Sequence, residues 1–282
     1  MMPLIHSMLK RPLLIALTLL SMLFLSSCGD NDDTNATKTI TMGFGPSTYV
    51  DQFEKGIRPI LEAKGFKVKV RVVSQNNQLN PSMKEGAIDA TVFQSRAYME
   101  SINPILKMNM VKLADTASAP QSLRSTRHSS LDAVKDGMTV TIPNDPVNGE
   151  RAARLLESLG WITIDENAEI ATFSAKSILP GNYTLSILEI DPAQSLRTLD
   201  DVDFAIVNGN YIANAGLKMS DGLALEATPE EHVVIVSIRG EDLDTEWAKA
   251  LKEAYESDEF RDYIHSEPLY DGFIMPKAWN QD

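Results

Sequence analysis

Cysteine and histidine are scarce in this chain of 282 residues. It has one cysteine, Cys28, and four histidines, His6, His128, His232 and His265. A single cysteine cannot form an internal disulfide, and no two histidines stand at the spacing of a zinc site. The sequence also has no G-x-S-x-G elbow, no Walker loop and no visible pair of nucleophile and base. We therefore expect a protein that is not an enzyme and that uses no cofactor and no metal ion. A hydrolase is the least supported function class.

Positive charge is also in deficit, with 26 Lys and Arg against 39 Asp and Glu and a net charge of −13. An acidic protein repels nucleic acid and anionic lipid headgroups. After Cys28 no segment approaches about 18 uninterrupted apolar residues, the usual minimum for a membrane-spanning helix. We therefore expect no nucleic-acid partner and no transmembrane helix in the mature chain.

The N-terminal 28 residues have the pattern of an exported lipoprotein. Lys10 and Arg11 precede an apolar run at residues 12–25. The run is shorter than the roughly 20 residues that span a bilayer, but it suits a secretory signal. It ends in Leu-Ser-Ser-Cys at residues 25–28, which resembles the lipobox cleaved by lipoprotein signal peptidase. We expect removal of residues 1–27 and a lipid on Cys28 as the only membrane contact. The alternative is an ordinary signal peptide with an incidental cysteine.

Residues 28–37 follow the cleavage site and lack hydrophobic periodicity. Their small and acidic side chains predict a flexible tether with a reach of about 15–20 Å. A lid or inhibitory tail is the alternative interpretation. Because Gly29 follows Cys28, where some lipoproteins carry a sorting aspartate, the sequence leaves the choice between inner and outer membrane open.

From residue 38 onward, short β-rich runs alternate with helical periodicity, which predicts an α/β fold with mostly parallel sheets. The strands are expected at residues 39–44, 67–73, 87–93, 110–113, 138–142, 203–207 and 232–238. The pattern restarts after Arg127, so we expect two lobes. Each lobe has a mixed, mostly parallel sheet flanked by helices. Residues 38–122 plus 230–282 form lobe 1, and residues 123–229 form lobe 2.

Arg151 is the first candidate for ligand binding. A strand is expected to end near Pro143, and a helix to start near Asn148, so that Arg151 lies in the first helical turn. A cation in the first helical turn is unfavourable, because it opposes the helix dipole. Its presence is explained if it holds an anion, such as a ligand carboxylate, beside the free backbone N–H groups of that turn. The alternative is a surface arginine paired with Glu150 or Glu157.

Three further candidates follow predicted strands. Phe93 and Tyr98 stand five residues apart where a buried strand gives way to a helix, and they belong either to the core or to a pocket wall. Asn208 follows the strand at 203–207 and either faces the same edge or caps the next helix. In open α/β sheets ligands bind at the carboxyl ends of the strands, where all these residues are expected.

Short motifs follow one another in a fixed order through most of the chain. They are Gly-Ala-Ile-Asp-Ala at 86–90 leading to Phe93-Gln94, Ser-Leu-Asp at 130–132, Pro-Asn-Asp-Pro at 143–146 with Asn148 and Arg151, Arg-Thr-Leu-Asp-Asp at 197–201, Ala-Ile-Val-Asn at 205–208 with Tyr211, and Tyr-Glu-Ser-Asp at 255–258. This set resembles the NlpA family of methionine-binding lipoproteins, which feed ABC importers. The resemblance implies a periplasmic-binding-protein fold of two lobes joined by a hinge, with an amino acid bound between the lobes. By this likeness Arg151 holds the carboxylate, Asn208 bonds the polar end, Asn148 shapes the loop, and Phe93 and Tyr98 wall the side-chain cage.

Several positions depart from the family pattern. Ser95 stands where the family usually has histidine, and Asn76 lies in the segment where it has tyrosine. Val234 replaces an expected asparagine, and residues 122–125 replace a Gly-x-Tyr-Ser motif. Each lost buried polar partner typically costs about 1–3 kcal/mol, or one to two decades of affinity. Ser95 and Asn76 therefore join the candidate ligand-binding residues, and the ligand is methionine, another amino acid or a short peptide.

The expected function is that of a monomeric, lipid-anchored substrate-binding protein in the cell envelope. Its partners are an amino acid or short peptide and an inner-membrane ABC permease. The alternative is a surface or interaction lipoprotein that keeps the fold but has lost or changed its ligand, which the changes at Ser95, Asn76 and Val234 motivate.

Overall fold

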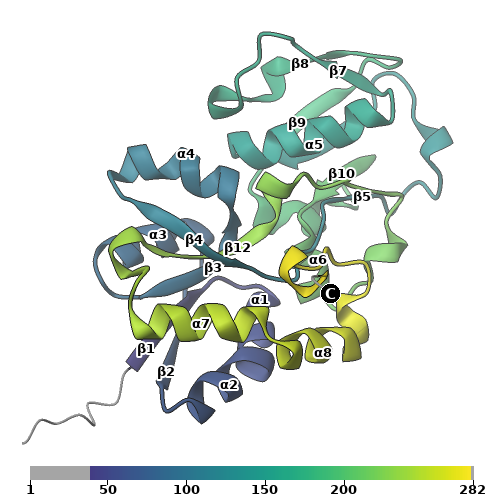
Figure 1. The fold of residues 1–282 in the computed structure, drawn as a ribbon. Helices are drawn as coiled ribbons and strands as arrows, with labels where there is room; N and C mark the ends of the chain where they lie inside the picture. The colour runs from purple at the N-terminus through teal and green to yellow at the C-terminus, as the bar shows by residue number, and fades with distance from the viewer. Residues whose placement is uncertain (1–38, 281–282) are drawn as a thin grey trace, which may run out of the picture. The chain divides into compact units, whose positions relative to one another are not determined.

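The computed structural model describes residues 39–280. The expected signal peptide at 1–27, the tether at 28–37 and the lipidation site Cys28 lie outside these residues. The described chain forms two five-stranded sheets and one two-stranded sheet, with helices packed on the larger sheets (Figure 1). The predicted α/β fold with two mixed sheets is confirmed.

The first sheet has the strand order β2-β1-β3-β12-β4. Its strands are β1 (Thr39–Phe44), β2 (Lys67–Val72), β3 (Ala90–Ser95), β4 (Met110–Asp115) and β12 (Val234–Arg239). In β1 the apolar residues Ile40, Met42 and Phe44 alternate and are fully buried, as expected for a strand that presents one face to a core. β1 pairs in parallel with β2 and β3, whereas β12 is antiparallel to both β3 and β4.

Helices cover both faces of the first sheet. One core lies against α1 (Tyr49–Gln52), a π-helical turn (Phe53–Ile57), α2 (Arg58–Ala63), α7 (Glu246–Glu256) and α8 (Asp258–Ser266). A smaller core of Leu79, Met83, Ile88, Met99, Met110 and Ile235 lies against α3 (Leu79–Lys84) and α4 (Arg96–Leu106). The burial of both sheet faces accounts for the nearly continuous apolar sequence of β12.

The second sheet has the order β11-β5-β10-β6-β9. Its strands are β5 (Ser122–Arg124), β6 (Thr139–Pro143), β9 (Ser186–Ile190), β10 (Phe204–Val207) and β11 (Ala224–Leu225). Helix α5 (Pro146–Ser158) and the hairpin of β7 (Ile162–Ile164) and β8 (Ile178–Pro180) enclose a separate core around Trp161 and Phe204. Helix α6 (Gly209–Asn214) follows β10.

Parallel pairings make up half of each large sheet, not most of it as the sequence predicted. The physical reason is that the chain passes twice between the sheets, after β4 and before β12. β12 returns from the second sheet and enters the first one at the carboxyl end of β3, where Val234 pairs with Ser95. A strand that enters at that end can only run antiparallel to β3.

Candidate functional site

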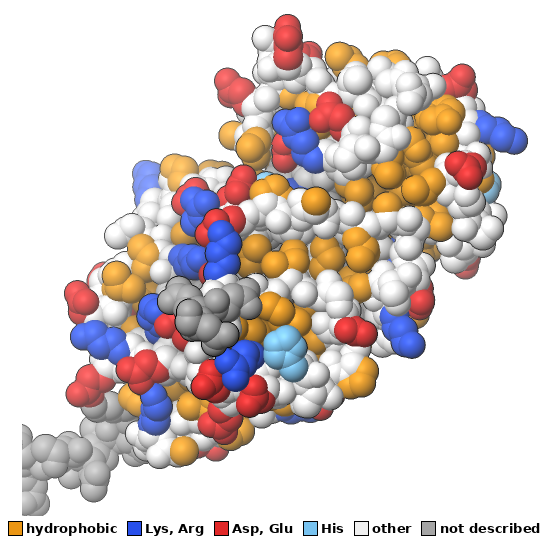
Figure 2. Space-filling model, turned by 45° about the vertical axis from the view of Figure 1, so that its right-hand side comes forward, with side chains coloured by type: hydrophobic (Ala, Val, Ile, Leu, Met, Phe, Trp, Pro, Cys, Tyr) orange, Lys and Arg blue, Asp and Glu red, His pale blue; other side chains and the backbone are white. Residues whose placement is uncertain are grey.

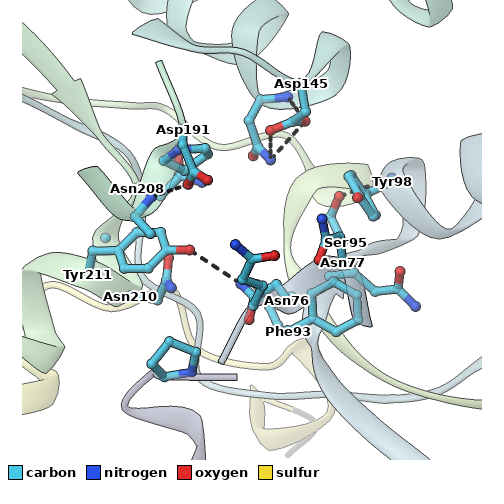
Figure 3. Close-up of a pocket in the computed structure, with 18 of the residues that line it drawn as sticks. Asn76, Asn77, Phe93, Ser95, Tyr98, Asp145, Asp191, Asn208, Asn210 and Tyr211 are labelled. Atoms are coloured by element: carbon cyan, nitrogen blue, oxygen red, sulfur yellow. Dashed lines mark hydrogen bonds between the residues drawn. The ribbon is translucent and has the colours of Figure 1, made fainter. Parts of the chain in front are cut away.

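A cavity of about 340 Å³ lies where the carboxyl ends of strands from both large sheets meet. The first sheet contributes residues 74–77 after β2, residues 93–98 at the end of β3 and Val234. The second contributes residues after β6, β9 and β10. The volume is at the small end of the range for ligand pockets. The cavity brings together all seven residues predicted to bind a ligand, Asn76, Phe93, Ser95, Tyr98, Asn148, Arg151 and Asn208. Figure 3 labels Asn76, Phe93, Ser95, Tyr98 and Asn208 among them.

Helix α5 positions Asn148 and Arg151 on the cavity wall. Asp145 is its N-cap, because the Asp145 carboxylate accepts the backbone N–H of Asn148 at 2.9 Å. Pro146 occupies the first helical position, where its missing N–H costs nothing. The helix therefore begins two residues before Asn148, the predicted start, and Arg151 lies in the second turn instead of the first.

Arg151 is buried and paired with Glu226. The Arg151 Nε and Nη2 donate to the two oxygens of Glu226 at 2.8 and 2.6 Å, and Nη1 donates to Asn148 Oδ1 at 2.8 Å. The two charged side chains are only 8% and 5% exposed. Glu150 and Glu157, the partners considered from the sequence, both contact Arg154 instead. The surface-pair interpretation of Arg151 is therefore wrong.

Glu226 is ionised in this environment. Burial alone would raise the pKa of its carboxyl, but the hydrogen bonds and charge of Arg151 outweigh burial and hold the pKa below its usual range. The backbone N–H of Gln121 and the hydroxyl of Thr228 also donate to Glu226, at 3.0 and 2.8 Å. The result is a bidentate, charge-assisted contact in which Glu226 balances the charge of Arg151.

Gln121 connects this ion pair to Asn208. Its side-chain Nε2 donates to Asn208 Oδ1 at 2.9 Å and to the backbone oxygen of Asn148 at 3.1 Å. Asn208 makes no side-chain cap on α6, so its predicted alternative role is not observed. Sequence reasoning missed both Gln121 and Glu226. Neither lies in a motif, and both reach Arg151 or Asn208 only through contacts between distant segments.

Phe93, Ser95 and Tyr98 form one wall of the cavity. The rings of Phe93 and Tyr98 pack edge to face with centroids 6.1 Å apart, and both side chains remain partly exposed. The Ser95 hydroxyl accepts the backbone N–H of Tyr98 at 3.2 Å and caps α4. Burial, followed by the charge of Asp145, raises the pKa of Tyr98 to about 12. The Tyr98 phenol therefore stays protonated and can donate a hydrogen bond.

Asn76 reaches from the first sheet's side of the cavity to the second. Its Nδ2 donates to the hydroxyl of Tyr211 at 3.4 Å, a long contact that joins the two walls (Figure 3). A Cβ at Gly45 would lie 1.7 Å from Asn76 Oδ1, so a larger residue at position 45 would displace the Asn76 carboxamide from this contact. Burial, followed by the charge of Asp191, raises the pKa of Tyr211 to about 12. Tyr211 is therefore a second protonated phenol facing the cavity.

The family follows from comparison with known proteins. A family model described as NlpA lipoprotein matches residues 40–278. The chain belongs to the NlpA lipoprotein family. The family predicted from the ordered motifs is thus confirmed. None of the helices within residues 39–280 of this NlpA lipoprotein has the length and hydrophobicity to span a bilayer.

Relatives and solved structures match nearly the whole of this NlpA lipoprotein. It is 29% identical over 267 residues to the D-methionine-binding lipoprotein MetQ of Salmonella typhi, covering 93% of this chain and 95% of that protein. A nutrient binding protein from Burkholderia cenocepacia bound to methionine has a TM-score of 0.78 and 28% identity, with 84% of this chain and 99% of that one covered. An ABC transporter periplasmic substrate-binding protein from Coxiella burnetii has a TM-score of 0.77 at the same identity and coverage.

Proposed function

We propose that this NlpA lipoprotein is the lipid-anchored substrate-binding protein of an ABC importer, and that its cavity takes methionine, another amino acid or a short peptide. The observation that carries the proposal is the buried Arg151 in a small cavity between two sheets. The relatives named for methionine binding and for ABC transport support this proposed function.

Arg151 has capacity for a ligand in addition to its protein partners. A guanidinium carries five N–H groups, and three of them donate to Glu226 and Asn148. The two that are left can hold a ligand carboxylate, and the Nδ2 of Asn208 lies on the same wall. In this proposal Asn148 keeps Arg151 oriented, Phe93 and Tyr98 pack against the ligand side chain, and Ser95 and Asn76 contact its end.

Two lobes surround the cavity in this proposed function, residues 38–122 plus 230–282 and residues 123–229. The two five-stranded sheets support these boundaries. Every residue of the first sheet's strands lies in the first lobe, and every residue of the second sheet's strands lies in the second lobe except Ser122, the first residue of β5. Closure of the lobes on the ligand would exclude water from the contact with Arg151. The protein acts as a monomer, is held by a lipid on Cys28 to the inner or outer membrane of the envelope, and delivers its ligand to an inner-membrane permease.

Nucleic acid and a charged lipid surface are poor partners for such a protein. The chain has a net charge of −13. On the face shown in Figure 2, Lys and Arg side chains are interspersed with Asp and Glu and do not form a continuous basic patch. A basic patch is the usual electrostatic footprint of a nucleic-acid-binding surface.

The test is a thermal-shift and calorimetric screen of amino acids and dipeptides on protein that has been unfolded, stripped of ligand and refolded. A ligand at about 100 times its Kd stabilises the folded state by about 2.7 kcal/mol, which corresponds to a Tm increase of about 5–10 °C. No response to any amino acid or dipeptide would refute the proposal.

Two variants identify the site. The double variant Arg151→Met/Glu226→Gln removes both buried charges together and should abolish the ligand response. Arg154→Met is the matched control, because Arg154 lies on the same helix but its side chain is 59% exposed. Retention of full ligand affinity by the double variant would place the binding site elsewhere.

A second candidate function is an interaction lipoprotein without a small-molecule ligand. The observation that favours it is that Glu226 already balances the charge of Arg151 within the protein. Native mass spectrometry of protein purified without denaturation separates the two functions. A stoichiometric bound molecule of the mass of an amino acid or short peptide would exclude this second candidate.

A further inference from the structure

The wall of the cavity is more polar than is usual for a small-molecule site. Nine of its 24 lining residues are Asn or Gln, and none of the 24 is Leu, Ile or Met. Ligand pockets are generally lined by hydrophobic and aromatic side chains with only a few polar groups. A wall of this composition favours a ligand that forms hydrogen bonds along its length, because polar groups left unpaired against an apolar ligand weaken its binding.

Two hydroxyl groups on the Phe93–Tyr98 wall have hydrogen-bonding capacity left for a ligand. The Ser95 hydroxyl accepts from the Tyr98 backbone, and its own proton has no acceptor within residues 39–280. The Tyr98 phenol likewise has no hydrogen-bond partner in the described part of the chain. Tyr98 lines the cavity from the side of the first sheet, and Asp145 lines it from the side of the second (Figure 3). Both groups are therefore available to a polar ligand end.

The charge balance of the cavity is negative. Among its lining residues only Asp145, Asp191 and Arg151 are charged. The charge of Arg151 is neutralised by Glu226, which does not line the cavity. The Asp145 carboxylate accepts three hydrogen bonds from Asn148, one from the backbone N–H and two from Nδ2, whereas Asp191 accepts the backbone N–H of Ala193. Lone pairs that a ligand could use therefore remain mainly on Asp191. These two carboxylates disfavour a second negative charge on the ligand and favour additional N–H groups.

Resting on the proposed function, we propose that the ligand's side chain ends in a carboxamide or an amine, and not in a thioether, a hydrocarbon or a carboxylate. Ser95 and Tyr98 are the specificity-determining residues that contact this end, and Asp145 and Asp191 set the preference against anions. Asn76, which lies between the Phe93–Ser95 wall and Tyr211, lines the same part of the cavity (Figure 3).

Pairs of ligands that match in shape test this inference by isothermal titration calorimetry on refolded, ligand-stripped protein. Glutamine is compared with methionine, lysine with norleucine, and glutamine with glutamate. We expect at least one member of the first two pairs, glutamine or lysine, to bind about tenfold or more tightly than its apolar counterpart, and glutamate to bind more weakly than glutamine. A site built to hydrogen-bond its substrate discriminates strongly against an analogue without that group.

The outcomes separate this inference from the proposed function. Methionine or norleucine binding as tightly as its polar counterpart, in both pairs, would overturn the inference and leave the transport function standing. Glutamate binding as tightly as glutamine would overturn it as well. No binding by any amino acid or dipeptide would overturn both.

The variant Tyr98→Phe tests the assigned residue. It removes only the phenol oxygen, which has no partner within residues 39–280, and it preserves the ring contact with Phe93. We expect the preference for the polar ligand to fall about tenfold while binding of its apolar counterpart is unchanged. The control Tyr183→Phe, outside the cavity, should leave the preference intact. An unchanged preference in Tyr98→Phe would refute the role of this residue.

Discussion

Replacing Glu226 with glutamine removes one charge of the buried ion pair and leaves Arg151 without a counterion. The Arg151 and Glu226 side chains are 8% and 5% exposed and share two hydrogen bonds of 2.8 and 2.6 Å. Breaking a buried pair by removing one partner costs about 3–5 kcal/mol. For a domain of this size that loss corresponds to a decrease in Tm of about 6–20 °C.

The assay is urea unfolding of ligand-free Glu226→Gln and wild-type protein at pH 7, monitored by circular dichroism. Glu100→Gln is the control, because Glu100 pairs with Arg96 at 3.3 Å on the surface, where both side chains are about half exposed. The free energy of unfolding of the control should change by less than about 0.5 kcal/mol. A loss of less than about 1 kcal/mol in Glu226→Gln, where about 3–5 is expected, would refute the buried-pair reasoning.

The double variant Arg151→Met/Glu226→Gln provides an internal check. Because it leaves no uncompensated charge in the interior, it should be more stable than Glu226→Gln alone. A double variant that is less stable by the sum of the two single losses would mean that the two residues do not interact energetically.

The same pair has a defined pH dependence. The folded-state pKa of Glu226 lies below its ordinary value, so the stability that Glu226 contributes is fully present above about pH 4.5. It is lost as the pH falls through the lowered pKa. The difference in unfolding free energy between wild type and Glu226→Gln should therefore be constant from pH 7 to about pH 5 and shrink at lower pH. A difference that grows on acidification would contradict this sign.

Three further predictions concern the helix starts and the anchor. Asp145→Ala should lower the free energy of unfolding by about 0.5–2 kcal/mol through loss of the α5 cap, measured by urea unfolding, whereas Asp145→Asn should retain most of it. Gly209→Ala should lower stability by about 1–3 kcal/mol, because its Cβ would collide with the carbonyl oxygen of Pro120. Calorimetry should also show weaker ligand binding, and wild-type stability would contradict the close approach. Cys28→Ala should abolish palmitate labelling and release the protein from the membrane fraction, and continued labelling would refute lipidation at this position.

Four of the candidate binding residues, Phe93, Tyr98, Arg151 and Asn208, could be predicted because they follow strands whose apolar pattern is visible in the sequence. The family resemblance added the other three, Asn76, Ser95 and Asn148. Parallel strands bring their carboxyl ends to one edge, so Phe93 near the end of β3 and Asn208 after β10 were expected at a ligand site. Whether Phe93 and Tyr98 belong to the core or the pocket was not predictable. That depends on which distant segments come to lie opposite them, and residues after β6, β9 and β10 of the second sheet line the same cavity.

By itself, the sequence determined the α/β alternation, the family and the segments that line the cavity, since all of these depend on local patterns and short motifs. Only the tertiary structure decided that Arg151 pairs with Glu226, that Gln121 bonds Asn208, and that Asn76 meets Tyr211. These contacts join residues 75, 87 and 135 positions apart. No periodicity links such positions, and their meeting depends on how distant segments pack together in the folded chain.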